Sequence, residues 1–208
     1  ASVPSSAISP IFSKTMTMAV ILALVLSILF LLARYLFYNK ILTSNDISKY
    51  TDIPVIGEVV TSRHKNEFSQ AVVHKNARSH ITENFRKIRT NLDYYPLDSK
   101  CRVIITTSTV PGEGKTFIAI NTADIYAMSG KKVLLVDFDL RKPRLEKCLN
   151  LDNEDGVSTI LTNRKPWQEC VHKDVIENMD VITSGPVTPI AAELLIGKNI
   201  DTFIEEVR

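Results

Sequence analysis

The sequence predicts an α/β fold, in which a parallel sheet with flanking helices follows one transmembrane helix. Three observations carry this prediction: an uninterrupted apolar run near the N-terminus, a glycine-rich loop between an apolar strand and a helix, and a further alternation of strands and helices behind that loop. Such alternation is the pattern of parallel sheets covered by helices. The 208 residues leave room for one ordinary domain and an appendage.

Charge and cysteine usage exclude some classes of protein. The formal net charge is only +2, so nothing in the overall charge points to nucleic acid as a partner. The three cysteines, Cys101, Cys148 and Cys170, show no CxxC spacing and cannot all pair with each other. They are typical of reduced thiols in a cytosolic compartment, and they predict neither a disulfide framework nor a metal site.

The apolar run predicts a transmembrane helix over residues 16–38. No charge lies between Lys14 and Arg34, and about 20 apolar residues are enough to cross the hydrocarbon core of a bilayer. A signal peptide is the first alternative, but it would need a basic leading region, a shorter apolar stretch and a small-residue cleavage site. A buried core helix is the second, but it would normally carry a polar stripe.

Basic residues near the predicted span set its orientation. Only Lys14 precedes the span, whereas several lysines and arginines follow it closely. Because positive residues favour the cytoplasmic side, residues 1–15 are predicted to form an exported, proline-containing segment. Residues 39–77 are then a juxtamembrane linker on the cytoplasmic side.

Three local features are predicted within this linker. Asn45 and Asp46 favour the start of a short helix that reaches Tyr50, and residues 54–60 favour a short strand. The polar and basic stretch 61–75 is expected to be a solvated linker, with contact to anionic lipid as the alternative.

An amphipathic helix is predicted to begin near Ser79. Its apolar residues recur at spacings of three and four and build one face: Ile81, Phe85, Ile88 and Leu92. Glu83, Arg86 and Arg89 form a separate lateral stripe that spells ExxRxxR. Taken alone, this triplet predicts only i,i+3 pairs on a solvated face.

A glycine-rich loop follows a predicted buried strand at residues 102–107. The loop, residues 108–116, reads STVPGEGKT and leads into a helix predicted from Phe117 to Ser129, with Gly130 closing its C-terminus. A strand, a glycine loop and a helix in this order are the context that a P-loop requires. The α/β fold is therefore predicted to be P-loop NTPase-like.

The residue types of the loop explain how it would bind a nucleotide. Gly112 and Gly114 let backbone N–H groups approach phosphate oxygens, to which the helix N-terminus adds its positive dipole end. Lys115 would contact the β- and γ-phosphates, and the Thr116 hydroxyl would ligate Mg²⁺. The pattern GxxxxGK[ST] expects glycine where this chain has Thr109. The predicted nucleotide-binding residues are Val110, Pro111, Gly112, Glu113, Gly114, Lys115, Thr116 and Phe117.

Two carboxylates follow the next apolar strand, residues 132–136. Because ligands bind at the carboxyl ends of parallel strands, Asp137 and Asp139 are predicted to face the glycine loop. Alone, such residues often cap a turn. Beside a P-loop they suggest metal coordination together with proton acceptance from an attacking tyrosine hydroxyl. A third strand at residues 179–183 and helices at 189–195 and 200–207 complete the alternation.

Together these motifs resemble a bacterial tyrosine kinase (BY-kinase) fused to the end of a polysaccharide co-polymerase, or chain-length determinant, module. The resemblance covers nearly the whole chain. It lies in the ExxRxxR triplet, in the Walker A stretch VPGEGKT from Val110 to Thr116, and in the Walker A′ stretch VLLVDFDLR from Val133 to Arg141. The tyrosine kinase domain corresponds to residues 78–208.

The resemblance implies phosphoryl transfer from ATP to protein tyrosine with Mg²⁺. Lys115, Asp137 and Asp139 would be catalytic, with Asp137 preferred as the base, and Thr116 and Asp139 would hold the metal. Glu83 and the two arginines of its triplet would assemble a ring-like homo-oligomer. The implied location is the bacterial inner membrane with a cytoplasmic kinase domain. The implied partners are the capsule or exopolysaccharide polymerisation and export machinery and tyrosine-containing protein substrates, with no nucleic acid.

Two family features are absent from the sequence, and two other functions remain as alternatives. No Walker B strand follows Asp139, and no tyrosine cluster lies near Arg208, so we expect a truncated and inactive kinase fragment. The first alternative is a deviant-Walker ATPase switch, which would carry lysine where Val110 stands and would lack a spanning helix. The second is a non-catalytic scaffold that regulates chain length and uses nucleotide only for assembly.

Overall fold

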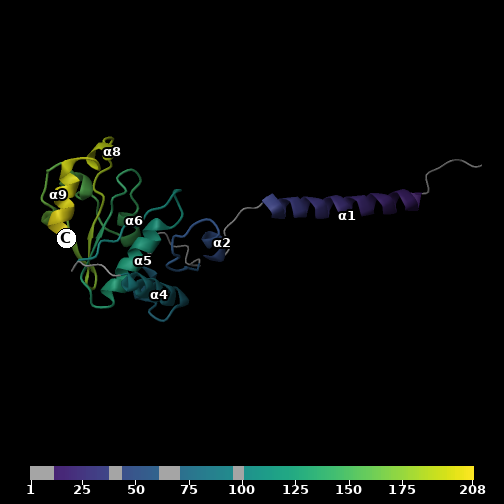
Figure 1. The fold of residues 1–208 in the computed structure, drawn as a ribbon. Helices are drawn as coiled ribbons and strands as arrows, with labels where there is room; N and C mark the ends of the chain where they lie inside the picture. Colours follow the sequence, from purple (N-terminus) through teal and green to yellow (C-terminus); the bar gives the residue numbers. More distant parts are fainter. Residues whose placement is uncertain (1–11, 38–43, 61–70, 96–100) are drawn as a thin grey trace, which may run out of the picture. The chain divides into compact units, whose positions relative to one another are not determined.

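The computed structural model describes residues 12–37, 44–60, 71–95 and 101–208 (Figure 1). The chain divides into two compact units, Ala1–Pro54 and Val55–Arg208. In the first unit, helix α1 spans Phe12–Phe37 and helix α2 spans Ser44–Ser48. Both match helices predicted from the sequence, although each begins earlier along the chain than predicted.

Helix α1 has the length and composition of a membrane span. It contains 26 residues and includes an 18-residue window with a mean hydropathy of 2.8. Its last turn carries Arg34, where a long basic side chain can reach the headgroup region. The predicted exported segment, residues 1–15, lies outside the described residues except for its last four positions.

The second unit contains a three-stranded sheet in the order β1-β3-β2. Strand β1 spans Val133–Val136, β2 spans His172–Ile176 and β3 spans Met179–Ile182. β1 and β3 are parallel, as predicted, with Val133 opposite Met179. β2 was not predicted, and it pairs with β3 in antiparallel orientation, so the sheet is mixed. β2 lacks a clear apolar pattern because the exposed Lys173 and Asp174 lie at its centre.

Helices cover both faces of the sheet. One face contacts α5 (Lys115–Ala127) and α6 (Leu145–Leu149) through Val133, Leu135, Met179 and Val181. The other contacts α7 (Val157–Leu161), α8 (Ala191–Leu194) and α9 (Lys198–Val207) through Leu134, Val136 and Ile182. Alternate residues of β1 and β3 thus enter opposite layers, as the two-residue period of a strand requires.

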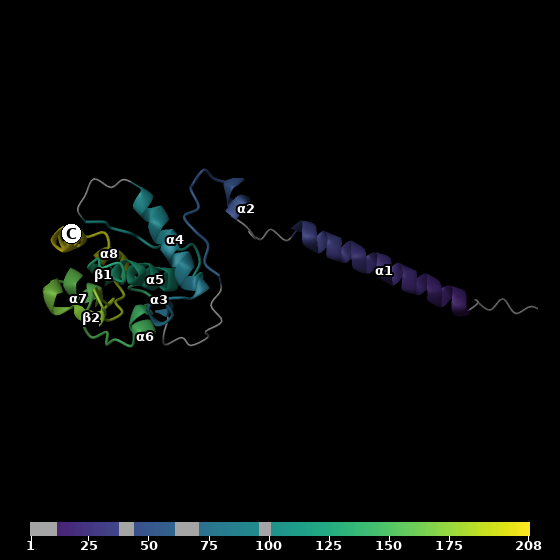
Figure 2. The ribbon, with the colours of Figure 1, turned by 90° about the horizontal axis from the view of Figure 1, so that it is seen from below.

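Helix α5 lies between the sheet and α4 (His80–Tyr94), and both views of the ribbon show α4 alongside it (Figures 1 and 2). Ser79 caps α4 by accepting the N–H of Thr82 at 3.2 Å, which agrees with the predicted start. Phe85 and Ile88 are buried against Ile125 of α5, so the predicted apolar face of α4 is confirmed. Contacts on two sides explain why most of α5 is buried.

The strand predicted at residues 54–60 does not form. Ile56 and Val59 instead pack against the apolar face of α4, and Asn91 of α4 donates a hydrogen bond to the Ile56 carbonyl at 2.7 Å. The contact leaves no room for a side chain at Gly57, where a Cβ atom would lie 2.5 Å from Cγ1 of Ile88. The segment packs on a helix and has no strand partner within the described part of the chain.

The buried strand predicted at residues 102–107 is also wrong. The segment forms no strand, and Val103, Ile104 and Ile105 are 56%, 45% and 85% exposed. Within the described sheet, β1 is an edge strand, and the segment pairs with none of the three strands. A β-branched run has the composition of a strand, but its backbone needs a neighbour for its hydrogen bonds.

Part of the predicted linker belongs to the folded unit. Residues Ala71, Val72 and Val73 are buried, and a short helix, α3, spans Val72–Lys75. The prediction of a solvated segment is therefore wrong for residues 71–73, whereas His74 and Lys75 are exposed. Residues 61–70, for which contact with lipid was the alternative, lie outside the described residues.

Candidate active site

The glycine loop leads directly into α5, as the sequence predicts. Gly114 is the N-cap of α5 with a φ of +97°, Gly112 has a φ of +92°, and the first helical hydrogen bond joins Ile118 N to Gly114 O at 2.9 Å. A Cβ atom at either glycine would meet no atom within 4 Å. The positive φ angles, and not crowding, therefore favour glycine here. The space beside the loop backbone is open to a ligand.

The carboxylates that follow β1 lie beside the start of α5. Asp137 N donates to Ile182 O at 3.0 Å, and Asp137 Oδ1 accepts the N–H of Asp139 at 2.9 Å. This turn brings Asp139 Oδ2 into an ion pair with Lys115 Nζ. Asp139 Oδ1 accepts the N–H of Lys142 at 3.0 Å. The structure thus gathers Lys115, Asp137 and Asp139, whose catalytic roles stay predictions.

The two carboxylates have opposite pKa shifts. Burial raises the pKa of Asp137, and the nearby charges of Asp139 and Glu146 add to this effect, against the N–H donors of Asp139 and Leu145. Burial also acts to raise the pKa of Asp139, but the hydrogen bond from Lys115, the Lys115 charge and backbone N–H donors outweigh it and hold that pKa below its ordinary value. One carboxylate is therefore suited to accept a proton, and the other stays ionised.

The oxygen groups near the loop suit a hard cation. Thr116 is half-buried in the first turn of α5, next to Lys115. Among the described residues, no three His, Cys, Asp or Glu side chains gather into a metal cluster. A hydroxyl and two carboxylates are ligands that fit Mg²⁺, which is usually held by few protein groups together with phosphates and water.

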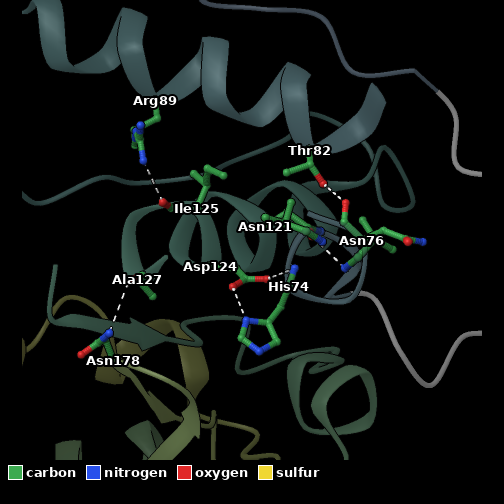
Figure 3. A network of polar contacts seen from close by, with 11 residues as sticks. His74, Asn76, Thr82, Arg89, Asn121, Asp124, Ile125, Ala127 and Asn178 are labelled. Carbon is green, nitrogen blue, oxygen red and sulfur yellow. Dashed lines mark hydrogen bonds and ion pairs between the residues drawn. The ribbon is translucent and has the colours of Figure 1, made fainter. Parts of the chain in front are cut away.

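The ExxRxxR triplet makes contacts within the chain. Arg86 pairs with Glu83 on α4 and also donates to the Ala77 carbonyl at 3.0 Å. Arg89 Nη1 donates to the Ile125 carbonyl of α5 at 3.2 Å (Figure 3). The stripe is therefore more than a solvated face, because Arg89 joins α4 to the P-loop helix. The role of the triplet in subunit assembly stays a prediction.

A polar network on α5 was not predicted. Asn121 Oδ1 accepts the N–H groups of Val72 and Val73 at 2.9 and 3.2 Å, and Asp124 Oδ2 accepts the N–H of His74 at 2.8 Å. These side chains, one turn apart on α5, satisfy the first N–H groups of α3 (Figure 3). The available signal was the spacing of Asn121 and Asp124, at i and i+3, inside the largely apolar helix KTFIAINTADIYA.

Asp124 is fully buried within this network. Burial raises its pKa, while the N–H of His74 and the charge of the His74 ring act to lower it. The His74 Nδ1 atom lies 3.6 Å from Asp124 Oδ1. Asn121 Nδ2 also donates to the Phe117 carbonyl at 2.8 Å, one turn closer to the loop. The network therefore ties α3 to the helix that presents the phosphate loop.

Known proteins resemble this chain in sequence and in structure. A family model described as an AAA domain matches residues 101–199. The tyrosine-protein kinase YwqD of Bacillus subtilis is 40% identical over 117 residues, which are 56% of this chain and 49% of YwqD. The tyrosine-protein kinase wzc of Salmonella typhimurium is 31% identical over 199 residues, which are 89% of this chain and 28% of wzc.

A solved structure extends the likeness to the fold. The crystal structure of the chimerical protein CapA2B2 aligns with a TM-score of 0.71 and 36% sequence identity, and the alignment covers 79% of this chain and 70% of that protein. The chain spans about half the length of YwqD and a smaller share of wzc.

Proposed function

Because this chain belongs to the bacterial tyrosine kinase family, we propose that it binds ATP and Mg²⁺ at the start of α5 and serves phosphoryl transfer to protein tyrosine. The observation that carries the proposal is the group formed by Lys115, Asp137 and Asp139, in which a P-loop lysine pairs with Asp139 and the N–H of Asp139 donates to Asp137, a carboxylate of unlike pKa. A tyrosine phosphotransferase needs such groups to hold phosphate and to accept a proton.

The nucleotide would bind at the open backbone of the loop. The N–H groups from Gly112 to Phe117 and the N-terminus of α5 would contact phosphate oxygens, and Lys115 would add a positive charge. Lys115 is paired with Asp139 in the structure, and its side chain is 38% exposed. We expect Lys115 to turn from Asp139 to the phosphates, because a triphosphate carries more negative charge than one carboxylate.

The freed carboxylate of Asp139 would then hold Mg²⁺ together with the Thr116 hydroxyl. The lowered pKa of Asp139 supports this role, because a metal ligand must be ionised. When bound, Mg²⁺ supplies positive charge that stabilises the phosphate oxygens during transfer.

Asp137 would act as the base. Its raised pKa makes it a better proton acceptor than an ordinary aspartate. A tyrosine hydroxyl that attacks the γ-phosphorus would lose its proton to the Asp137 carboxylate as the new O–P bond forms and ADP leaves. The N–H of Asp139 donates to Asp137 Oδ1, which holds the carboxylate in place.

The proposal extends to location and assembly. Helix α1 would anchor the chain in the bacterial inner membrane, with the second unit in the cytoplasm and residues 1–15 exported. Glu83, Arg86 and Arg89 would contact a neighbouring copy in a ring. The process served would be capsule or exopolysaccharide polymerisation and export, as the resemblance of the motifs implies.

Phosphotyrosine detection tests the reaction. The full-length protein, expressed from its own gene, should gain phosphotyrosine when Mg·ATP is added. The Lys115→Met variant should give no phosphotyrosine signal while remaining folded. Hydrolysis of ATP without phosphotyrosine would favour a deviant-Walker ATPase switch. Nucleotide binding with neither reaction would favour a scaffold. Either result would refute the kinase proposal.

A further inference from the structure

The first turn of the phosphate loop is held by a side chain. Thr109 stands where the GxxxxGK[ST] pattern has its first glycine. In the structure, Glu113 Oε2 accepts the N–H of Thr109 at 3.0 Å and the N–H of Val110 at 3.1 Å. The Glu113 carboxylate therefore joins the end of the loop to its first residues, Thr109 and Val110.

We propose that the Glu113 side chain is a positioning residue that fixes the entry of the phosphate loop, where this chain lacks the expected glycine. The inference rests on the proposed nucleotide-binding function and assigns Glu113 a role beyond its place in the loop backbone. The residue touches no reacting atom in this account. It acts on ATP binding through the shape of the loop.

The backbone of the loop explains why it needs the two hydrogen bonds to Glu113, which we call the anchor. Pro111 has no N–H group, and Gly112 and Gly114 take positive φ angles, so backbone hydrogen bonds cannot close this stretch as they close a helix. Ser108 Oγ adds a second link by donating to the Val110 carbonyl at 3.3 Å. Two N–H donors on one carboxylate oxygen form a charge-assisted contact, which is stronger than a neutral one.

The anchor and the charge of Glu113 have opposite effects on nucleotide affinity. The carboxylate repels the phosphates of ATP, so removal of its charge alone should strengthen binding. Removal of the anchor should weaken binding, because a loop that is not already ordered must lose conformational entropy when the nucleotide binds. A comparison of two neutral substitutions therefore separates the anchor from the charge.

Glu113→Gln and Glu113→Ala supply this comparison in the full chain. Both remove the charge, but only glutamine keeps an oxygen that can accept the two N–H groups. By calorimetry, we expect Mg·ATP to bind Glu113→Ala about tenfold more weakly than Glu113→Gln. Glu177→Ala, which removes an exposed charge in the turn between β2 and β3, is the control and should bind as the unmodified chain does. Equal affinities for the two Glu113 variants, or tighter binding by Glu113→Ala, would overturn the proposal.

Amide hydrogen exchange tests the anchor without nucleotide. In the nucleotide-free chain, the amides of Thr109 and Val110 should exchange faster in Glu113→Ala than in Glu113→Gln. Equal exchange would refute the anchor even if nucleotide binds. If the unmodified chain fails to bind Mg·ATP, the proposed function is wrong, and the exchange rates still decide whether Glu113 holds the loop.

Discussion

The two ends of α5 differ in how they are held. At its N-terminus, Lys115 and Thr116 are partly exposed and follow an open loop with two positive φ angles. Further along, Asn121 and Asp124 are buried and bind the backbone of α3. Buried hydrogen bonds fix the position and rotation of the helix, so its first turn can present unoccupied N–H groups to a ligand. A binding site is more precise when rigid elements support it.

The comparison predicts that substitutions at the two ends have different consequences. At the loop end they should alter nucleotide affinity and leave stability nearly unchanged. In the buried part they should change stability and leave the intrinsic affinity of the folded protein nearly unchanged.

Lys115→Met should give the largest effect. We expect the affinity for Mg·ATP to fall by roughly a hundredfold, because the positive charge of Lys115 no longer contacts the phosphates. Thermal unfolding should change little, since the Lys115–Asp139 pair is partly exposed and such pairs contribute little to stability. Calorimetry and a thermal scan measure the two quantities. An unchanged affinity would show that the loop is not the phosphate site.

Asn121→Ala tests the other end. The substitution would leave the buried N–H groups of Val72 and Val73 without their acceptor, and we expect the free energy of unfolding to fall by about 2 kcal/mol. Asn91→Ala is a matched control, because Asn91 is exposed and makes one hydrogen bond, to the Ile56 carbonyl. The two variants are compared by denaturant unfolding. Equal losses would show that capping of α3 does not stabilise the unit.

The arginines of α4 should give a smaller effect on stability. Arg89→Ala removes the bond to the Ile125 carbonyl and Arg86→Ala removes the bond to the Ala77 carbonyl, so each should cost about 1 kcal/mol. Loss of the exposed pair between Arg86 and Glu83 should add little. The double variant should also lower the oligomeric mass in light scattering and keep nucleotide binding. An unchanged mass would restrict these arginines to contacts within one chain.

Asp124→Asn should give the smallest effect and a distinct pH dependence. Since burial raises the pKa of Asp124 in the folded state, folding takes up a proton between the unfolded pKa, about 3.9, and the raised value. The contribution of Asp124 to the wild-type free energy of unfolding therefore falls as pH rises through this window. Asparagine still accepts the His74 N–H but carries no charge, so the variant should be about 0.5 kcal/mol more stable at pH 7.

Unfolding free energies across pH check this sign. The advantage of Asp124→Asn should shrink as the pH falls toward 4, because the wild-type carboxyl becomes neutral as well. The same pair of proteins in a His74→Ala background shows how much of the difference between them depends on the ring next to Asp124. A variant that is less stable at every pH would contradict the cause assigned to the pKa shift.

The sequence predicts the elements whose pattern is local and long. Helices α1, α4 and α5 follow from apolar length or period, and β1 and β3 follow from their apolar runs. The segment 102–107 has the same composition as those strands, yet it is exposed because strand formation depends on a neighbour that composition does not specify. Strand β2 has no apolar run, because the exposed Lys173 and Asp174 lie within it, and helix α3 is too short for a period to stand out.

The candidate site was predictable to a similar extent. The P-loop and the two aspartates follow from their spacing and from the rule that ligands bind at the carboxyl ends of parallel strands. The capping of α3 by Asn121 and Asp124 joins residues about 50 positions apart, which no local pattern reveals. The Glu113 contact is local, but an acidic residue in a phosphate-binding loop is first expected to repel the phosphates. Its hydrogen bonds to the loop backbone were therefore not predicted.

Amide hydrogen exchange along α5, with and without Mg·ATP, shows whether the buried part of the helix is fixed before the loop binds nucleotide. We expect nucleotide to slow exchange strongly at Gly112 to Phe117 and hardly to change it at Asn121 to Ala127, where packing protects the amides before any ligand binds. Protection that begins only in the second half of α5, or none in the loop, would contradict the claim that a fixed helix presents this loop to ATP.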